Sequence, residues 1–259
     1  MPQRTIAPAK DASNNHQIVL NEGDVKFTLF LPDVKASSEI LTVHFHTAEW
    51  FVVQEHIRRG ARHPLAIFYL GEGSTVYRRA FEDAYRFGRV LKLIEARLGT
   101  PVKALEISSF SAGYGAVREI IKQPEYFARI SAIVLADSMY AALNTNSVRT
   151  PLSEHIEVWV PFARAAIEGK KTFVFTYSAV PTSTYASSSE CAQALLAALN
   201  MRDIAVEAGS TPAAREKDFP LLRRADKGNL HLWGYGGTNA QAHMTHPRHI
   251  AEIWKAIGD

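Results

Sequence analysis

Short apolar runs typical of β-strands alternate along this chain with segments of helical spacing, and this alternation most restricts the fold. Leu65–Leu70 reads LAIFYL and is closed by a Gly-Glu-Gly turn, as expected for a strand that is buried on both faces. Tyr77–Leu98 then carries apolar residues at helical spacing and ends at Gly99. Strands joined by helices of this length pair in parallel through right-handed crossovers. The alternation therefore predicts an α/β fold, with a mostly parallel central sheet and helices on both faces.

The remaining expected elements continue this alternation. Strands are expected at Gln17–Leu20, Lys26–Leu31, Ile40–His46, Val102–Phe110, Ile130–Leu135, Thr172–Tyr177 and Leu230–Trp233. Helices are expected at Ala112–Lys122, Leu152–Ile167, Glu190–Leu199 and Pro247–Ile257. No helix separates the first two strands, so we expect an antiparallel entry to the sheet.

Composition narrows the class of protein. The chain has 259 residues, is 47% hydrophobic and carries a formal net charge of +3. A chain of this length can bury one sizeable core, and so weak a positive charge does not predict a nucleic-acid partner. We expect one domain over residues 16–259 after a flexible segment 1–15. Residues 138–170 are expected either to pack on the sheet or to form a small cap insertion.

The sequence gives little about the compartment. The single cysteine, Cys191, excludes an intramolecular disulfide framework and is expected to be buried and inert. No apolar run is long enough for a membrane span, so we expect a soluble protein. It would be cytoplasmic by default, and secreted or periplasmic if a leader was removed.

The segment around Ser111 carries the strongest chemical signal. It reads Glu106-Ile-Ser-Ser-Phe-Ser-Ala-Gly-Tyr-Gly-Ala, which is a strand, a sharp turn at Ser111 and a helix. A nucleophilic serine on such a turn needs small residues two positions before and after it, because strand and helix approach closely. Ser109 and Gly113 occupy these positions, and Ser111 alone among the serines has Gly, Ala or Ser at both. The alternative is a surface serine on a tight turn.

This segment resembles the nucleophile elbow of the α/β-hydrolase superfamily, which includes serine esterases and lipases. The resemblance covers about residues 26–257 by element order, and Ser109 stands where Gly-x-Ser-x-Gly has its first glycine. It implies an α/β-hydrolase fold, a triad in the chain order Ser–Asp/Glu–His, and an oxyanion hole made by two backbone N–H groups. One of these belongs to the residue after the nucleophile, Ala112, and the other to the loop after the family's third strand.

That loop follows Leu41–His46 and is similar to the family's His-Gly oxyanion loop, with Thr47 where glycine is usual. The chemistry needs an N–H group and not a particular side chain, so Thr47 is the implied donor, and its hydroxyl could add a third. His44 and His46 share a sheet face at the end of a strand, so a metal site is one interpretation. The other is hydrogen-bonded histidines that support the loop, since no further ligand cluster is apparent.

The resemblance places the general base in the loop between the last strand and the closing helix. His243 lies at the end of the expected loop, after Gly236, and is the predicted base. His246, at the start of the expected closing helix, is the alternative. His231 falls inside a strand, and His249 falls within that helix.

The triad acid is expected at one of two strand ends. The family usually carries it after the strand that is here Thr172–Tyr177, but the loop 178–189 contains no Asp or Glu. Asp137 directly follows the preceding buried strand, and some lipases of the family carry the acid there. The carboxyl ends of neighbouring strands are adjacent, so Asp137 is predicted to orient His243. Glu190 is the reserve candidate, and a simple capping role for Asp137 is the alternative.

Apolar and aromatic residues at the same edge predict a substrate pocket, with core packing as the alternative. These residues are Trp50, Tyr114, Met139, Tyr140 and Tyr185. The predicted function is a serine hydrolase that cleaves a small-molecule carboxylic ester through an acyl-enzyme, without a cofactor or a metal. Two alternatives stay open: a metal-dependent hydrolase using His44 and His46, and a non-catalytic binding protein on the same fold. The sequence does not indicate the natural substrate or the oligomeric state.

Overall fold

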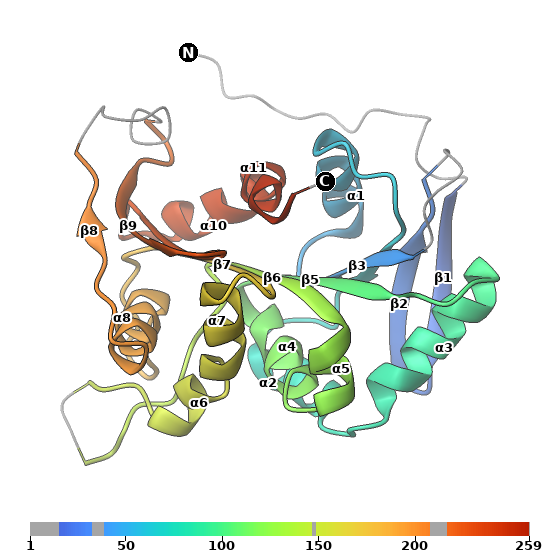
Figure 1. Ribbon diagram of the computed structural model, residues 1–259, viewed down its shortest axis with the longest axis horizontal. Coiled ribbons are helices and arrows are strands. Elements are labelled where there is room, and N and C mark those ends of the chain that lie inside the picture. The colour runs from blue at the N-terminus through green and yellow to red at the C-terminus, as the bar shows by residue number, and fades with distance from the viewer. Residues whose placement is uncertain (1–15, 33–38, 147–148, 208–216, 259) are drawn as a thin grey trace.

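The computed structural model describes residues 16–32, 39–146, 149–207 and 217–258, so the predicted flexible segment 1–15 lies outside the described residues. The strands are β1 Gln17–Glu22, β2 Val25–Phe30, β3 Ile40–Phe45, β4 Leu65–Phe68, β5 Ala104–Phe110, β6 Ile130–Ala136, β7 Thr172–Tyr177, β8 Ile204–Ala205, β9 Leu221–Lys227 and β10 Leu230–Tyr235. They form one sheet in the order β1-β2-β4-β3-β5-β6-β7-β10-β9-β8 (Figure 1).

The centre of the sheet is parallel and both edges are antiparallel. Strands β4, β3, β5, β6, β7 and β10 pair in parallel. At one edge β1 pairs antiparallel with β2, and β2 pairs antiparallel with β4, which confirms the expected antiparallel entry. At the other edge β9 and β8 are antiparallel additions. The mostly parallel sheet predicted from the alternation is therefore confirmed.

Helices cover both faces of the sheet. They are α1 Glu49–Arg58, α2 Ser74–Phe81, α3 Arg86–Leu98, α4 Tyr114–Ile120, α5 Pro124–Arg129, α6 Ser153–Glu157, α7 Val160–Ile167, α8 Ser188–Ala198, α10 Ala240–Arg248 and α11 Ile250–Trp254, with short 3₁₀ turns η2 Ser111–Gly113 and η3 Lys255–Ile257. Helices α1, α10 and α11 lie on one face, and α2 to α8 lie on the other (Figure 1). None of the helices in the described ranges is long and apolar enough to cross a bilayer.

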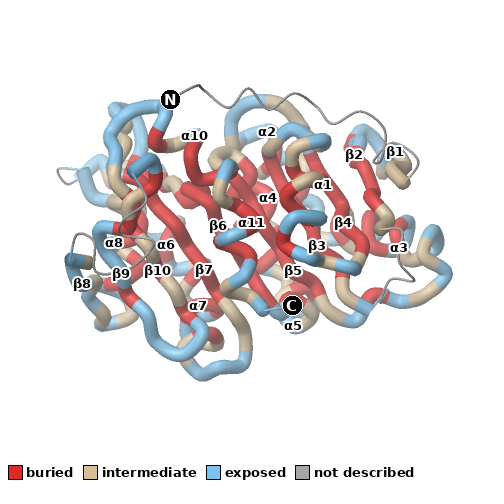
Figure 2. Tube along the Cα trace, turned by 90° about the horizontal axis from the view of Figure 1, so that it is seen from above, coloured by how far each residue is buried: buried red, intermediate tan, exposed pale blue. Residues whose placement is uncertain are grey.

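Each face of the sheet has its own core, because successive residues of a strand point to opposite faces. On β4, Ala66 and Phe68 join the core beneath α2 to α8, whereas Leu65 and Ile67 join the core beneath α1 and α11. The central strands are accordingly buried along most of their length (Figure 2). This burial on both faces explains why these strands read as continuous apolar runs.

Two expected helices are each divided in the structure. The segment expected as one helix from Tyr77 to Leu98 breaks between α2 and α3, because the side chain of Asp83 accepts the N–H of Tyr85 at 3.0 Å and its carbonyl accepts that of Arg86 at 3.0 Å. This local turn competes with the helix. The segment expected at Leu152–Ile167 is α6 and α7, and Pro161 stands in the first turn of α7, where proline is tolerated.

The second half of 138–170 packs on the sheet. Trp159 and Phe162 are fully buried, and their rings lie 6.2 Å and 5.8 Å from the ring of Phe173 on β7. Of the two interpretations, packing on the sheet therefore describes α7. A cap role for the loop that precedes α6 stays a prediction.

The sequence prediction lacked α1, α5, β8 and β9. Helix α1 buries Val52, Val53 and His56, a stripe at helical spacing, but no side chain caps its first turn. Strand β9, which lies between β10 and the two-residue edge strand β8, is polar and buries only Leu221 and Ala225. Its sequence does not alternate between apolar and polar residues, so periodicity alone does not separate β9 from a loop.

Candidate active site

Ser111 stands at the sharp turn between β5 and η2, in a left-handed backbone conformation with φ of 48°. This conformation costs an L-residue about 1–2 kcal/mol and persists only where the surroundings hold it. A Cβ at Gly113 would lie 2.5 Å from the carbonyl oxygen of Phe45, so only glycine fits there. Both features match the predicted strand–turn–helix geometry.

Two buried serines support this turn. The hydroxyl of Ser138 donates to the carbonyl oxygen of Ser111 at 2.8 Å, and the hydroxyl of Ser109 lies 2.8 Å from that of Ser138. Because the Ser138 hydrogen is already used, Ser109 is the donor in this pair. Ser109 is thus small, as the turn requires, and its hydroxyl also belongs to the hydrogen bonds that help to hold Ser111.

The structure brings together the three residues predicted as a triad. The Ser111 hydroxyl oxygen lies 2.9 Å from Nε2 of His243, and Nδ1 of His243 lies 2.7 Å from Oδ2 of Asp137. The imidazole stacks on Phe110, with ring centroids 4.6 Å apart. Asp137 is fully buried, whereas the His243 side chain is 21% exposed. A buried carboxylate is thus linked by hydrogen bonds through an imidazole to a serine at the accessible edge of the sheet.

Asp137 occupies a cage of donors. Its Oδ1 accepts hydrogen bonds from the Ser178 N–H at 3.0 Å and from the Ser188 hydroxyl, and its Oδ2 accepts from the Ser178 hydroxyl at 2.6 Å and from His243. Burial raises the pKa of Asp137, but the nearby His246 and His243 and the Ser178 hydrogen bond outweigh burial and hold this pKa well below its ordinary range. Burial also lowers the pKa of His246 to about 4, so His246 is uncharged at neutral pH. Asp137 is therefore ionised at neutral pH although it is fully buried.

His243 lies inside α10 and not in the loop where the sequence predicted it. Asn239 begins the helix, since its side-chain oxygen accepts the N–H of Ala242 at 3.0 Å. Pro247, which was expected in the first turn of a later helix, instead lies near the end of α10. Proline has no N–H to continue the ladder, and α10 ends one residue later, at Arg248.

The other candidate histidines are engaged elsewhere. The ring of His246 is buried, with Nδ1 2.8 Å from the hydroxyl of Thr176. His249 stacks on Phe219 at 4.6 Å. His231, on β10, lies 2.7 Å from a carboxylate oxygen of Asp226.

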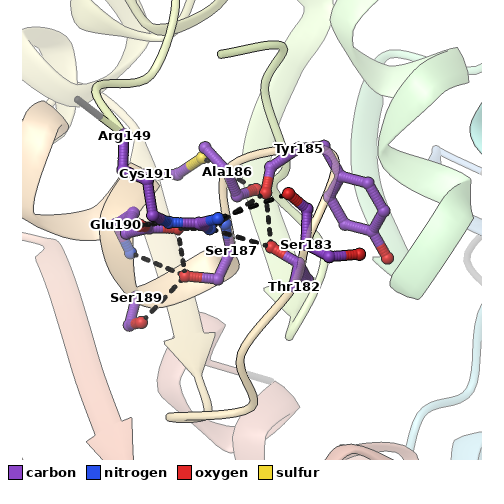
Figure 3. A network of polar contacts seen from close by, with 9 residues as sticks. All are labelled: Arg149, Thr182, Ser183, Tyr185, Ala186, Ser187, Ser189, Glu190 and Cys191. Carbon is purple, nitrogen blue, oxygen red and sulfur yellow. Dashed lines mark hydrogen bonds and ion pairs between the residues drawn. The ribbon is translucent and has the colours of Figure 1, made fainter. Parts of the chain in front are cut away.

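Glu190 has a different environment from the one a triad acid needs (Figure 3). It forms a capping box with Ser187 at the start of α8, a known stabilising arrangement for helix N-termini. Its two carboxylate oxygens also accept from Nε and Nη2 of Arg149 at 2.8 and 2.9 Å. Arg149 further donates to the carbonyl oxygens of Ser183 and Tyr185, at 3.4 and 3.3 Å. Glu190 therefore organises the loop before α8, and its oxygens face Arg149 and Ser187.

The two implied oxyanion donors lie beside the elbow. Ala112 is the second residue of η2, and the first N–H groups of a helix have no acceptor within the helix. Thr47 follows His46, the first residue after β3, which has a left-handed conformation with φ of 65°. The Thr47 hydroxyl donates to the carbonyl oxygen of His46 and lies 3.0 Å from Nε2 of His44. The hydroxyl that was expected as a third oxyanion donor is thus used within the loop.

Both histidines of the possible metal pair have hydrogen-bond partners. Nδ1 of His44 lies 3.0 Å from the Ser108 hydroxyl, and Nδ1 of His46 lies 2.9 Å from the Tyr77 hydroxyl. Burial, and then His46, lowers the pKa of His44 to about 3. Across the described ranges, no three His, Cys, Asp or Glu side chains are arranged to hold a metal ion. These contacts favour the loop-supporting interpretation of the pair.

Three of the five expected pocket residues form a cluster. The ring of Tyr140 lies 5.7 Å from that of Tyr114 and 5.5 Å from that of Tyr185. Trp50 is half exposed and packs on its neighbour Phe51, and Met139 is fully buried. The tyrosines are thus the part of the expected set that lies together near the elbow, since Tyr114 begins α4.

Known structures resemble the chain over nearly its whole length. LpqC, a poly(3-hydroxybutyrate) depolymerase from Bordetella parapertussis, has a TM-score of 0.54 and 16% identity, over 94% of this chain and 90% of its own. Poly(aspartic acid) hydrolase-1 from Sphingomonas sp. KT-1 has a TM-score of 0.53 and 11% identity, over 95% and 100%. A cold-adapted esterase from an Arctic intertidal metagenomic library has a TM-score of 0.51 and 12% identity, over 95% and 98%.

The chain has the α/β-hydrolase fold. No family model matches it, and no curated protein matches it in sequence. Identities of this size establish the fold alone. The fold alone does not identify the chemistry of this protein, which depends on its own residues.

The hydroxyls around Asp137 were missed in the sequence. The loop 178–189 drew attention for its lack of Asp and Glu, yet its Ser178 and Ser188 donate hydrogen bonds to Asp137. A serine-rich loop beside a strand that ends in Asp is the signal that could have identified them. Cys191, in contrast, is buried as expected, and burial raises the pKa of its thiol to about 12.

The buried histidines predict a stability that falls in acid. Burial lowers the pKa values of His44 and His56 to about 3 and that of His246 to about 4, below the ordinary value of about 6.5. Between these values and pH 6.5 the unfolded chain binds protons that the folded chain does not. The free energy of unfolding should therefore decrease as the pH is lowered below about 6.5. Each histidine contributes a slope of up to about 1.4 kcal/mol per pH unit.

Urea unfolding between pH 5 and pH 8 measures this dependence. His56→Gln should reduce the slope between pH 5 and pH 6.5, because it removes one titrating group while keeping a donor for the His63 carbonyl oxygen, which His56 Nε2 contacts at 2.9 Å. An unfolding free energy that is flat over this range would contradict the assignment.

Proposed function

We propose that this protein is a serine hydrolase that cleaves a carboxylic ester through an acyl-enzyme. The observation that carries the proposal is the hydrogen-bonded chain from Ser111 through His243 to Asp137, at 2.9 and 2.7 Å. A serine hydroxyl is a weak nucleophile until an adjacent base accepts its proton, and the imidazole is placed for that task. The same arrangement recurs in serine hydrolases with unrelated folds, so the geometry of the three residues, and not the fold, supports the proposed chemistry.

Each group has a defined step in the proposed reaction. Ser111 Oγ attacks the acyl carbon while His243 Nε2 accepts its proton, and Asp137 stabilises the resulting imidazolium. The N–H groups of Thr47 and Ala112 hold the oxyanion of the tetrahedral intermediate. Collapse of this intermediate expels the alcohol, which takes the proton from His243. A water molecule, deprotonated by the same imidazole, then hydrolyses the acyl-enzyme and releases the acid.

Asp137 also selects the tautomer of His243. Because its Oδ2 accepts the hydrogen of Nδ1, the Nε2 lone pair is left free to face Ser111. Four donors point at this carboxylate in the interior, so it stays ionised without a cation beside it. A carboxylate held in this way can stabilise the imidazolium each time it forms.

The proposed substrate class is a small-molecule ester. The aromatic cluster of Tyr114, Tyr140 and Tyr185 would contact its apolar part. An esterase and a depolymerase among the similar structures support ester cleavage. Initial rates on p-nitrophenyl esters of increasing acyl length test this class, and a maximum at a defined length would identify the acyl group that fits.

Activity should not depend on a metal ion. Dialysis against EDTA is expected to leave kcat within about twofold, because the proposed chemistry uses only protein groups and both His44 and His46 have hydrogen-bond partners. The assay compares p-nitrophenyl ester hydrolysis before and after dialysis. Loss of activity in EDTA that added zinc restores would instead support the metal-dependent alternative.

A non-catalytic binding protein is the remaining alternative. Such a protein would bind an ester without turnover and would not react with a fluorophosphonate. Stoichiometric labelling by a fluorophosphonate, together with ester turnover, is expected from the proposal and excludes a pure binding role.

A further inference from the structure

A chain of hydrogen bonds crosses the interior and ends at the oxyanion loop. The indole Nε1 of Trp254, in α11, donates to the hydroxyl oxygen of Ser108 on β5 at 2.9 Å. That hydroxyl lies 3.0 Å from Nδ1 of His44 on β3, and Nε2 of His44 lies 3.0 Å from the hydroxyl oxygen of Thr47. The Thr47 hydroxyl donates to the carbonyl oxygen of His46.

These contacts have one consistent direction. The Thr47 hydroxyl hydrogen goes to the His46 carbonyl, so the Thr47 oxygen can only accept from Nε2 of His44. Burial keeps His44 neutral near pH 7, so the imidazole carries a single hydrogen, which is then on Nε2. Nδ1 therefore accepts the hydrogen of the Ser108 hydroxyl, whose oxygen accepts from the Trp254 indole. With this assignment every donor in the chain has an acceptor.

The last acceptor belongs to the peptide group that matters for the proposed reaction. The carbonyl of His46 and the N–H of Thr47 are two ends of one planar, trans peptide unit, and they point in opposite directions. A hydrogen bond that fixes this carbonyl therefore also fixes the direction of the Thr47 N–H. His46 has a φ of 65°, a conformation that a non-glycine residue keeps only where its surroundings hold it.

We propose that the Thr47 hydroxyl is a positioning group: held by His44 and Ser108, it fixes the His46–Thr47 peptide so that the Thr47 N–H faces the oxyanion. This inference rests on the proposed ester hydrolysis and adds residues that do not touch the substrate. It also explains why residue 47 is threonine, where the resemblance implies glycine. A glycine would leave the peptide free to rotate, because glycine restricts the backbone least.

Substitutions at Thr47 test the role of the hydroxyl. Thr47→Val keeps the β-branched shape and removes the hydroxyl, and Thr47→Gly removes the whole side chain. Both should lower kcat on a p-nitrophenyl ester by about 10- to 100-fold with KM within about threefold, somewhat less than the loss of an entire oxyanion donor. Thr47→Ser keeps the hydroxyl and should stay within about threefold of the wild type in kcat.

Thr28 provides the matched control. It is a buried threonine on β2 whose hydroxyl has no hydrogen-bond partner among the residues that the structure describes, so Thr28→Val makes the same chemical change away from the chain of hydrogen bonds. We expect Thr28→Val to leave kcat and KM unchanged. Binding of an alkylboronic acid, which forms a tetrahedral adduct with a serine, should weaken in Thr47→Val in proportion to kcat/KM and stay unchanged in Thr28→Val.

A second measurement does not depend on activity. Nitrogen-15 NMR of the histidine rings should show His44 as the neutral tautomer with hydrogen on Nε2, and Ser108→Ala should weaken this preference. The opposite tautomer in the wild type would reverse the chain and overturn the inference.

The outcomes also separate this inference from the proposed function. If Thr47→Val keeps kcat within about twofold of the wild type, or Thr47→Ser falls as far as Thr47→Val, while Ser111→Ala is inactive, the positioning role is wrong and the proposed hydrolase remains. If Ser111→Ala is as active as the wild type, the proposed function fails, and the positioning role that rests on it fails too.

Discussion

Replacing Ser111 with alanine should lower kcat for ester hydrolysis by about 10⁴-fold or more, while leaving the fold intact. The change removes the hydroxyl oxygen that lies 2.9 Å from Nε2 of His243, so the imidazole loses the nucleophile that it would activate. What remains is the stabilisation that the oxyanion donors give to direct attack by water. Steady-state kinetics on a p-nitrophenyl ester measures the loss, and circular dichroism with urea unfolding verifies the fold.

Ser131→Ala is the matched control for this change. Ser131 lies near the start of β6, at the opposite end of the strand from Asp137, and its hydroxyl donates to the Leu105 carbonyl oxygen at 3.1 Å. The same loss of a hydroxyl should leave kcat unchanged there. An active Ser111→Ala protein, or an equal loss of activity in Ser131→Ala, would contradict the assignment of the nucleophile.

Replacing Asp137 with asparagine should lower kcat by up to about 10⁴-fold. Asparagine keeps the shape, but its amide can donate to Nδ1 and so stabilise the tautomer whose Nε2 carries a hydrogen and cannot accept one from Ser111. It also removes the charge that balances the imidazolium of His243. Steady-state kinetics for Asp137→Asn, under the conditions used for the wild type, measures this effect.

Glu190→Gln is the informative comparison, because Glu190 was the other acid that the sequence offered. In the structure its carboxylate caps α8 and pairs with Arg149 (Figure 3). Glutamine keeps an oxygen that can accept the Ser187 N–H, so the replacement should retain the cap and lose only the ion pair with the exposed Arg149. We therefore expect a small decrease in the free energy of unfolding and a near-normal kcat. A near-normal kcat in Asp137→Asn combined with a large loss in Glu190→Gln would move the acid to the later strand. Near-normal values in both would leave a dyad or no triad at all.

The fold could be predicted because its central elements are governed by local rules. The run at Leu65–Phe68 is apolar because both of its faces are buried, and the turn at Ser111 needs small neighbours because strand and helix touch. Strand β9 follows no such rule, since it is defined by its pairing with β10 and not by its own composition. The break between α2 and α3 likewise depends on one turn at Asp83, which does not change the helical spacing of the apolar residues and so cannot be predicted from it.

The residues of the candidate site could be predicted from the sequence, but the groups that surround them could not. Ser111, Asp137 and His243 are each fixed relative to a strand end or to the last helix, so the sequence narrows them to a few candidates. Their catalytic roles stay predictions. The donors around Asp137 and the partner of His44 come from distant parts of the chain: Ser178 is 41 residues from Asp137, and Ser108 is 64 residues from His44. Such pairings follow from the packing of the sheet, and the serine-rich composition of the loop 178–189 is the one local sign of those around Asp137.

The proposed mechanism requires Ser111 to form a covalent intermediate. Mass spectrometry of the protein after reaction with a fluorophosphonate, followed by peptide mapping, tests this requirement. We expect one label per chain, located on Ser111, with none on Ser111→Ala and much slower labelling of Asp137→Asn. Absence of labelling in a folded wild-type protein that hydrolyses esters, or a label on another residue with Ser111 unmodified, would contradict it.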